Sequence, residues 1–343
     1  MKRAPLLSLF ALLLLASCEK MLMPDDAPAS PTATFDYLWH QLDERYSMFD
    51  VKRVDWQAVY DSLRPKVYDG MENDSLFSVC AAMLNTLRDG HVNLFNNYNT
   101  SHSDSIYYRF YADDDIDIDA VILTYLGPGY RTTGGMAHGA LCDGRVLYIR
   151  YASFSSTIGV SQLRHIIRSY PNAQGMILDL RGNSGGTISN IHNILSVMPS
   201  HGQKLYSSQL KAGPGHNDFT PPADTYAPMV ADSNAYTRPV IVLIDRGCFS
   251  ATSTFAICTQ AYDNMRLMGD TTSGGLGLPT MGVLPNGWRY RYSVTRTLAL
   301  DGGNYENGVP PDIPLRLDRQ AALASRRDNI IDSACNLILT PQP

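Results

Sequence analysis

The sequence lacks the features that mark several common classes of protein. Its 343 residues hold 28 Lys and Arg against 33 Asp and Glu, so it has no excess of positive charge with which to bind nucleic acid. No internal repeat is visible, and after the first eighteen residues no apolar run approaches the roughly 20 residues that span a bilayer. With 44% hydrophobic and 18% charged residues, the composition indicates a globular protein that does not bind nucleic acid.

Cysteine patterns typical of metal sites are also missing. The six cysteines are widely and irregularly spaced, and no two form a C-x-x-C pair, which argues against a structural metal site and against a disulfide framework. Cys80 and Cys258 fall on the apolar faces of predicted helices, where cysteine usually acts as a small hydrophobic side chain. We therefore expect a protein that uses neither a metal nor a cofactor.

The N-terminus is typical of a lipoprotein leader. Two basic residues precede an apolar run over residues 6–16, which is half of what a membrane span needs. Leu15-Ala16-Ser17-Cys18 looks like a bacterial lipobox, whose cysteine is acylated after cleavage; an ordinary secretory signal with a chance cysteine is the alternative. We expect a signal peptide over residues 1–17, a flexible Pro-rich tether over 18–34, and a lipid-anchored protein of the bacterial cell envelope, at the periplasmic or surface face of the outer membrane.

The region after the tether has the pattern of a small helical domain. Apolar residues recur with a 3.6-residue period over residues 35–49, 55–67 and 75–87, which predicts three helices. We place this domain at residues 35–92. The following segment, 93–140, is rich in Tyr and alternates in polarity, so it is expected to contain short strands.

From residue 141 to the end, buried strands alternate with helices, which predicts an α/β core. The strands are expected at 146–154, 175–181, 239–245 and 265–270, and the helices at 160–169, 188–198 and 251–262. Asn286-Gly287 between two alternating segments is a hairpin signal. Asp318 is expected to cap a last helix of about twenty residues.

Residues 179–186, with the sequence DLRGNSGG, take a buried strand into a glycine-rich turn. Backbone N–H groups of such a turn can converge on an anion. Phosphate binding is disfavoured because no Lys-Ser/Thr follows the glycines and no G-x-G-x-x-G spacing is present. An oxyanion hole is the better interpretation, and a tight turn without function is the alternative.

Ser250 lies where another apolar strand ends and a helix begins. A serine at the positive end of a helix dipole is placed to stabilise the negative charge of an acyl-transfer intermediate, and the N–H of Ala251 can share in holding it. On spacing alone, Ser250 and Ser253 would be equally good as plain helix N-caps.

Four strings occur in an order found in a known family: DLRGNSGG, FSATSTFA (249–256), GDTTSGG (269–275) and ENGVPPD (306–312). Over roughly residues 141–315 the chain resembles the C-terminal processing peptidases and tricorn-like serine peptidases. The resemblance implies a core related to the ClpP and crotonase folds. It also implies a nucleophile at Ser250, with oxyanion donors at Gly185 or Gly186 and at Ala251.

The catalytic base separates the two branches of this family. The processing branch uses a lysine where this chain has Gly275, and no lysine follows Lys211. The tricorn-like branch implies His91 as the base and Glu306 as the acid that orients it. His91 follows a predicted helix C-terminus, which would favour the imidazolium, so we expect its pKa near or slightly above the usual value for histidine.

One position departs from the tricorn-like pattern, because Gly90 stands where those enzymes have a serine that relays between histidine and glutamate. Glu306 must then reach His91 directly or through a water. Asp89 is the alternative acid, although a residue so close in sequence has difficulty reaching the ring. Fewer than the roughly 85 residues of a PDZ module separate His91 from Asp143, so no PDZ domain is expected.

Together these features predict an extracytoplasmic, membrane-tethered serine peptidase that cleaves peptide or unfolded protein substrates through an acyl-enzyme. The departures at Gly90 and Gly275 leave open a homologue that binds peptides without cleaving them. The same three residues could also serve a nonpeptidase acyl hydrolase. The oligomeric state is not indicated by the sequence.

Overall fold

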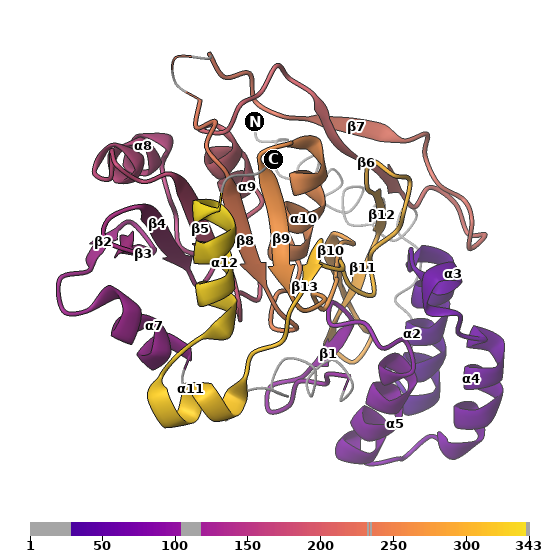
Figure 1. Ribbon diagram of the computed structural model, residues 1–343. Helices are drawn as coiled ribbons and strands as arrows, with labels where there is room; N and C mark the ends of the chain where they lie inside the picture. Colours follow the sequence, from indigo (N-terminus) through magenta and orange to yellow (C-terminus); the bar gives the residue numbers. More distant parts are fainter. Residues whose placement is uncertain (1–28, 104–117, 232, 234, 341–343) are drawn as a thin grey trace, which may run out of the picture.

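The computed structural model describes residues 29–103, 118–231, 233 and 235–340 (Figure 1). The predicted signal peptide, Cys18 and much of the predicted tether lie outside the described residues. Within those ranges, none of the helices combines the length and apolar character needed to cross a membrane.

The first described segment folds into a group of helices, here called the helical body, with its own core of buried residues that include Phe35, Trp56 and Met83. It consists of α2 (Pro31–Arg45), α3 (Phe49–Lys52), α4 (Trp56–Leu63), the 3₁₀ turn η1 (Arg64–Lys66) and α5 (Asn73–Asn85). The first helix starts earlier than the apolar pattern predicts, because Ser30 accepts a hydrogen bond from the N–H of Ala33 and a proline opens the helix. The three predicted helices are otherwise confirmed.

The larger part of the molecule is built on a seven-stranded sheet with the order β13-β9-β8-β5-β4-β3-β2. The strands are β2 (Arg131–Thr133), β3 (Met136–Leu141), β4 (Val146–Tyr151), β5 (Gly175–Asp179), β8 (Val240–Ile244), β9 (Met265–Gly269) and β13 (Ile313–Pro314). The strands from β13 to β4 run parallel, whereas β3 and β2 are antiparallel. The sheet therefore begins at β2, before the residue at which the sequence pattern changes.

Helices cover both faces of this sheet. The helices α8 (Val160–Arg168), α9 (Ser189–Leu195) and α10 (Ala251–Cys258) share one buried cluster with the strands, and α12 (Asn329–Leu339) shares another. In Figure 1, α12 crosses in front of the strands while α9 and α10 lie behind them. Ile177 packs on the α12 side and its neighbour Leu178 on the other, as the alternation of a strand requires. Burial on both faces explains why these strands are almost wholly apolar.

Two small sheets join the helical body to this core. One has the order β1-β11-β10, with β1 (Asn93–Phe95), β10 (Pro279–Val283) and β11 (Arg289–Ser293). The other has the order β12-β6-β7, with β6 (Lys204–Leu210), β7 (Ala223–Tyr226) and β12 (Thr295–Leu298). The predicted hairpin at Asn286-Gly287 joins β10 to β11. β1 follows the helical body and pairs with β11. This pairing attaches the C-terminal end of the helical body to the core.

Two expectations about the elements need correction. The segment over residues 93–140 does contain the predicted short strands, β1, β2 and most of β3, but it also contains the helix α7 (Ile118–Leu126); its residues 104–117 lie outside the described residues. The predicted last helix is two helices, α11 (Arg319–Ser325) and α12. The chain turns between them because Arg326 adopts a left-handed conformation with φ 52° and Asp328 caps the next helix by accepting from two backbone N–H groups.

Asp328 also closes a buried network of charges at the carboxyl end of β5. Arg181 pairs with Asp179 at 2.5 Å and with Asp328 at 2.7 Å, and all three side chains are at most 2% exposed. Burial alone would raise the pKa of Asp179, but the neighbouring Arg181 lowers it to about 2. The network therefore ties the glycine-rich turn after β5 to the C-terminal helix.

Candidate active site

Ser250 occupies a strained turn at the start of a helix. β8 ends at Ile244, and α10 begins at Ala251. The N–H of Ser250 donates to the carbonyl of Gly274 at 2.9 Å. The backbone of Ser250 has φ 56° and ψ −119°, a conformation that costs a non-glycine residue about 1–3 kcal/mol. The turn presents the hydroxyl at the positive end of α10, where developing negative charge is stabilised.

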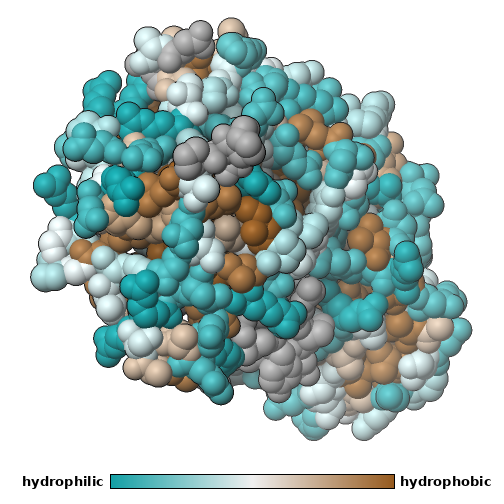
Figure 2. Space-filling model, in the orientation of Figure 1, coloured by the Kyte–Doolittle hydropathy of each residue, from teal (hydrophilic) through white to brown (hydrophobic). Residues whose placement is uncertain are grey.

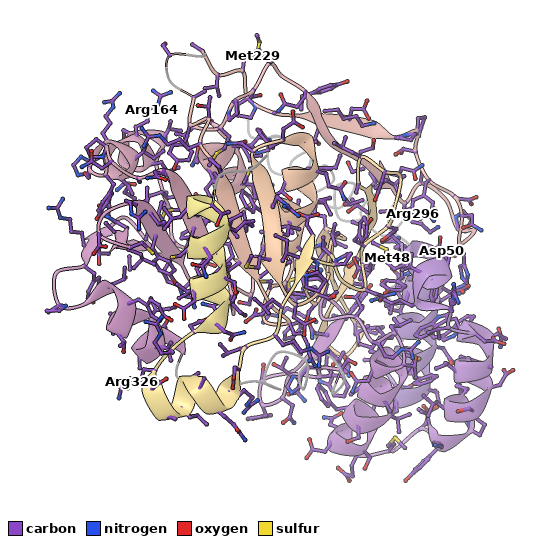
Figure 3. The ribbon with its side chains drawn as sticks, viewed as in Figure 1. Met48, Asp50, Arg164, Met229, Arg296 and Arg326 are labelled. Carbon is purple, nitrogen blue, oxygen red and sulfur yellow. The ribbon has the colours of Figure 1, made fainter. Side chains whose placement is uncertain are left out.

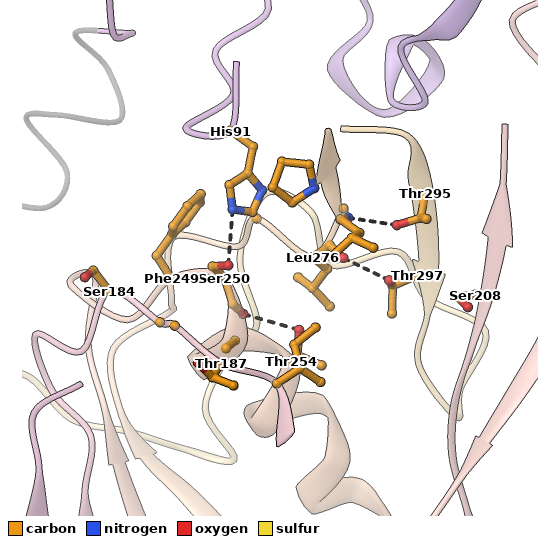
Figure 4. Close-up of a pocket in the computed structure, with 18 of the residues that line it drawn as sticks. His91, Ser184, Thr187, Ser208, Phe249, Ser250, Thr254, Leu276, Thr295 and Thr297 are labelled. Atoms are coloured by element: carbon orange, nitrogen blue, oxygen red, sulfur yellow. Dashed lines mark hydrogen bonds between the residues drawn. The ribbon is translucent and has the colours of Figure 1, made fainter. Parts of the chain in front are cut away.

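The ring of His91 meets this hydroxyl. Nε2 of His91 lies 3.1 Å from Oγ of Ser250, within hydrogen-bond distance (Figure 4). His91 is only 4% exposed, and its ring lies against that of Phe249 with the centroids 4.7 Å apart. The structure thus brings together the two residues that sequence motifs single out as nucleophile and base.

His91 is held by a turn rather than by a helix end. α5 ends at Asn85, so the helix dipole, which acts within the last turn, does not reach the ring. The N–H of His91 instead donates to Oδ1 of Asp89 at 2.7 Å. Burial lowers the pKa of His91 to about 4, and this outweighs the opposing effect of the Asp89 charge. The expectation of an ordinary or raised pKa is therefore wrong, and His91 is neutral near pH 7.

Glu306 lies in the site but does not touch the ring of His91 among the described contacts. Its Oε2 accepts from the N–H groups of Leu276 and Gly277 at 2.7 and 3.0 Å. Its Oε1 lies 3.7 Å from Nζ of Lys52. Burial and the nearby charge of Asp89 raise the pKa of Glu306. A direct hydrogen bond from Nδ1–H of His91 to the carboxylate of Glu306, one of the two possibilities that the sequence leaves, is therefore not observed.

Asp89 does not fill that place either. Its Oδ2 accepts from the phenol of Tyr46 at 2.8 Å, and its Oδ1 is used by the backbone of His91. Nδ1 of His91 is buried without a hydrogen-bond partner in the described part of the chain. The backbone of Gly277 lies close enough to favour the protonated ring, although it does not complete a hydrogen bond with Nδ1.

The glycine-rich turn after β5 lies directly beside Ser250. A Cβ on Gly185 would come within 2.9 Å of both Ser250 Cβ and the nitrogen of Ala251. The N–H of Gly185 donates to Oδ1 of Asn183 at 2.9 Å and so is not free to bind an oxyanion. In the described residues, the N–H groups of Gly186 and Ala251 have no acceptor. Of the three predicted donors, these two are available.

The turn that carries Gly275 explains why a lysine could not stand there. Gly275 has φ +74°, and a Cβ on it would lie 2.2 Å from the ring of Phe249. Its N–H donates to the carbonyl of Glu306 at 3.0 Å. A side chain at residue 275 would displace the aromatic ring that packs against His91.

These groups open into a cavity of about 910 Å³. Residues on its wall include Ser155, Ile188, Tyr206, Thr254, Leu278 and Arg291. The lining mixes hydroxyl groups with apolar surface and is wide enough for several residues of an extended peptide. Ser184 is also on the wall, whereas Ser253 is fully buried and hydrogen-bonded to Thr272. Among the described residues, no group of His, Cys, Asp and Glu could hold a metal ion.

Three residues of the site are given no role by the sequence analysis. Asn183 holds the glycine turn, because its Oδ1 accepts from Gly185 and from the hydroxyl of Thr252 at 2.9 Å each. Arg291 donates to the carbonyl of His91 at 3.2 Å. Lys52 reaches the site from the helical body. Asn183 stands inside the DLRGNSGG string and could have been inferred from it, but the other two are brought in by the tertiary fold.

Comparison with known proteins places this geometry in a family. Residues 145–315 match the profile of Peptidase family S41, and residues 27–85 match that of the Tricorn protease C1 domain. A crystal structure of a candidate peptidase from Parabacteroides merdae is 34% identical, covering 91% of this chain and 97% of that one, with a TM-score of 0.84. The chain belongs to peptidase family S41, a family of serine-type peptidases that includes the C-terminal processing proteases.

Other relatives are more distant. The carboxy-terminal processing protease CtpA of Bacillus subtilis (strain 168) is 27% identical over 185 residues, which is 53% of this chain and 37% of that protein. The chain thus matches less than half the length of this curated relative. The structure of mature CPAF is 12% identical with a TM-score of 0.67, covering 90% of this chain and 97% of that one, and shares the fold. The predicted α/β peptidase core with an N-terminal helical region is confirmed.

Proposed function

We propose that the protein is a serine peptidase that cleaves peptide bonds through an acyl-enzyme on Ser250. The observation that supports this most directly is the 3.1 Å contact between Nε2 of His91 and Oγ of Ser250 at the edge of the cavity. A nucleophile and a base within hydrogen-bond reach are the first requirement of this chemistry. Peptide or unfolded protein segments are the proposed substrates.

In the first step, His91 Nε2 accepts the proton of the Ser250 hydroxyl while Oγ bonds to the carbonyl carbon of the substrate. The carbonyl oxygen gains negative charge, which the N–H groups of Gly186 and Ala251 stabilise. The C–N bond then breaks, and His91 gives its proton to the leaving amine. Water, deprotonated by the same histidine, hydrolyses the ester and restores Ser250.

Glu306 acts as the orienting acid through the backbone of residues 276 and 277 and not by direct contact with His91. Its carboxylate fixes the N–H groups of Leu276 and Gly277, and the backbone of Gly277 faces the ring of His91. Its charge also offsets that of the imidazolium that forms during the reaction. A single carboxylate therefore supports both the position and the charge of the base.

The protein is further proposed to work outside the cytoplasm, tethered to the bacterial envelope by lipid on Cys18. The lipobox-like sequence and the Pro-rich segment that follows it support this proposal. Such a tether would leave the folded part free to meet substrates near the membrane.

Labelling with a fluorophosphonate probe and turnover of a peptide library test the proposed activity. Ser250→Ala should abolish both, whereas Ser184→Ala and Ser253→Ala should retain much of each. Loss of a nucleophile costs orders of magnitude in rate, while loss of the buried hydrogen bond between Ser253 and Thr272 costs about 1–3 kcal/mol of stability.

Three other results of these experiments would point to a different function or a different nucleophile. A folded wild type that binds peptides without being labelled would be a non-catalytic binder. Labelling of Ser250 with turnover of simple esters but of no peptide would indicate a nonpeptidase acyl hydrolase. Labelling that survives in folded Ser250→Ala would contradict the nucleophile.

A further inference from the structure

Lys52 is a buried lysine whose ammonium group lies between the loop that carries His91 and the loop that carries Glu306. Its side chain is 3% exposed. Nζ donates to the carbonyl of Arg88 at 3.3 Å and to Oδ1 of Asn307 at 2.9 Å. The third neighbour is Oε1 of Glu306 at 3.7 Å. An ammonium group has three donors, and here each one faces an acceptor.

The segment around Lys52 is fixed to both loops. The guanidinium of Arg88 donates back to the carbonyl of Lys52 at 3.1 Å, so these two residues hold each other. Next to Lys52, Asp50 pairs with Arg296 at 3.3 Å. Figure 3 shows Met48, Asp50 and Arg296 together where α3 meets the loop around β12. The lysine is therefore part of a fixed contact between the helical body and the core.

The charges around Lys52 require a cation at this place. Asp89 and Glu306 are both 1% exposed, and the charge of Asp89 raises the pKa of Glu306. Arg291 is bound to the carbonyls of His91 and Gly90. A buried carboxylate without a partner is strongly unfavourable. Lys52 is the cation nearest to Glu306 and favours its ionised form.

We propose that Lys52 is a positioning residue for the reaction, which holds Glu306 ionised and fixes the loops of Glu306 and His91 relative to each other. This inference rests on the proposed peptidase activity and extends it. Lys52 does not act as the base, because all its contacts are to these acceptors and it has none with Ser250 in the described structure. The helical body thus supplies the cation behind the acid, and the turn that follows it supplies the base.

The first experiment compares Lys52→Met with Lys52→Arg and with Lys66→Met, an exposed lysine of the same helical body. Initial rates of fluorophosphonate labelling and kcat/KM for a peptide would be measured as functions of pH. We expect Lys52→Met to lower kcat/KM by roughly tenfold or more. Lys52→Arg should recover part of this loss, and Lys66→Met should match wild type.

The pH profile separates this role from a purely structural one. Tyr46, Asp89 and Arg291 remain in place around Glu306 and His91 in the variant. The positive charge of Lys52 lowers the pKa of both Glu306 and His91, so its removal raises both. The acid limb of kcat/KM should therefore move to higher pH in Lys52→Met. A lower rate with an unshifted limb would overturn the proposal.

A double-mutant cycle with Glu306→Gln tests whether Lys52 acts through Glu306. In the Glu306→Gln background there is no carboxylate to hold, so adding Lys52→Met should cost less than twofold in kcat/KM. Equal losses in both backgrounds would show that Lys52 acts independently of Glu306. If Lys52→Met does not fold, the double variant, which removes both charges, still permits the comparison with Glu306→Gln alone.

These outcomes stand apart from the proposed activity itself. Wild type that is labelled at Ser250 and turns over peptides, with Lys52→Met indistinguishable from it at every pH, would overturn the role of Lys52 alone. Wild type that is never labelled would overturn the peptidase proposal before Lys52 is considered.

Discussion

Gly275 lies against the ring of Phe249, so closely that a Cβ on the glycine would come within 2.2 Å of the ring. Phe249 in turn packs against His91. The packing around His91, the proposed base, therefore depends on the absence of a side chain at residue 275.

Gly275→Ala should lower both stability and labelling of Ser250. The new methyl group clashes with Phe249, and φ +74° disfavours any residue with a Cβ. Gly287→Ala is the matched control, because Gly287 has a similar φ of +86° with no atom within 4 Å of its Cβ position. Urea unfolding of both variants isolates the clash, which we expect to add about 1–3 kcal/mol. Equal losses in the two variants would mean that Phe249 moves aside without cost.

The pH dependence of kcat/KM should distinguish His91 from Glu306. Burial lowers the pKa of His91 to about 4, so the base is neutral at all pH values well above that. Burial raises the pKa of Glu306, so its charge is lost as pH falls through that higher value. We expect Glu306→Gln to slow turnover at neutral pH and to remove the upper of the two acid limbs. The loss should be smaller than the roughly 10⁴-fold effect of neutralising an acid that contacts its histidine. A single limb near pH 6.5, unchanged in Glu306→Gln, would contradict this assignment.

Removal of Arg181 should destabilise the fold far more than removal of a surface ion pair. Arg181→Met leaves Asp328 buried without its cation and Asp179 with only the longer contact to Arg150 at 3.8 Å, which should cost about 3–5 kcal/mol in urea unfolding at pH 7. Lys204→Met serves as the control: Lys204 pairs with Asp224 at 2.7 Å but is 40% exposed, so its loss should cost about 1 kcal/mol or less.

Acid titration of wild-type stability reports on the same network. Because the pKa of Asp179 is lowered to about 2 in the folded protein, its ion pair stabilises the fold fully above the usual value of 3.8. This contribution is lost as pH falls from 3.8 toward 2. Arg181→Met should lack that part of the titration, and a wild-type-like acid profile in the variant would contradict the role of the network.

Cys18→Ala should move the protein from the membrane fraction to the soluble fraction. The lipobox-like sequence makes Cys18 the only expected attachment point. Fractionation of cells followed by immunoblotting measures the change, and Cys80→Ala is the control. If Cys18→Ala still sediments with membranes, the lipid anchor is wrong.

The sequence predicts the strands of the core well because each is an apolar run between turn residues, as in β5 and β8. Ser250 and His91 can be singled out from the sequence because each stands in a short motif that resembles the family pattern. Predicted helix boundaries are wrong where a single residue interrupts the apolar periodicity. Arg326 does so by adopting a left-handed conformation in the middle of a predicted helix. Two residues further on, Asp328 pairs with Arg181, which is distant in sequence, so the pattern around residue 326 does not reveal this contact.

The electrostatics of the site could not be predicted in the same way. The pKa of His91 depends on how completely the ring is buried, and the ring packs against Phe249, which is distant in sequence. Lys52 stands in the short segment Phe-Asp-Val-Lys, which has no feature to distinguish it from a surface lysine. Its contact with Glu306 joins parts of the chain that only the docking of the helical body brings together.

The pairing of β1 with β11 bears on the order in which the parts of the site appear during synthesis of the chain. His91 precedes Ser250 by 159 residues, and β11, which holds the strand after His91, comes later still. During synthesis or export the base therefore emerges first, the nucleophile much later, and the strand and acid that complete the site last. If these residues act as proposed, an incomplete chain lacks a complete site, and the peptidase site forms only once nearly the whole polypeptide has emerged and folded back on its beginning.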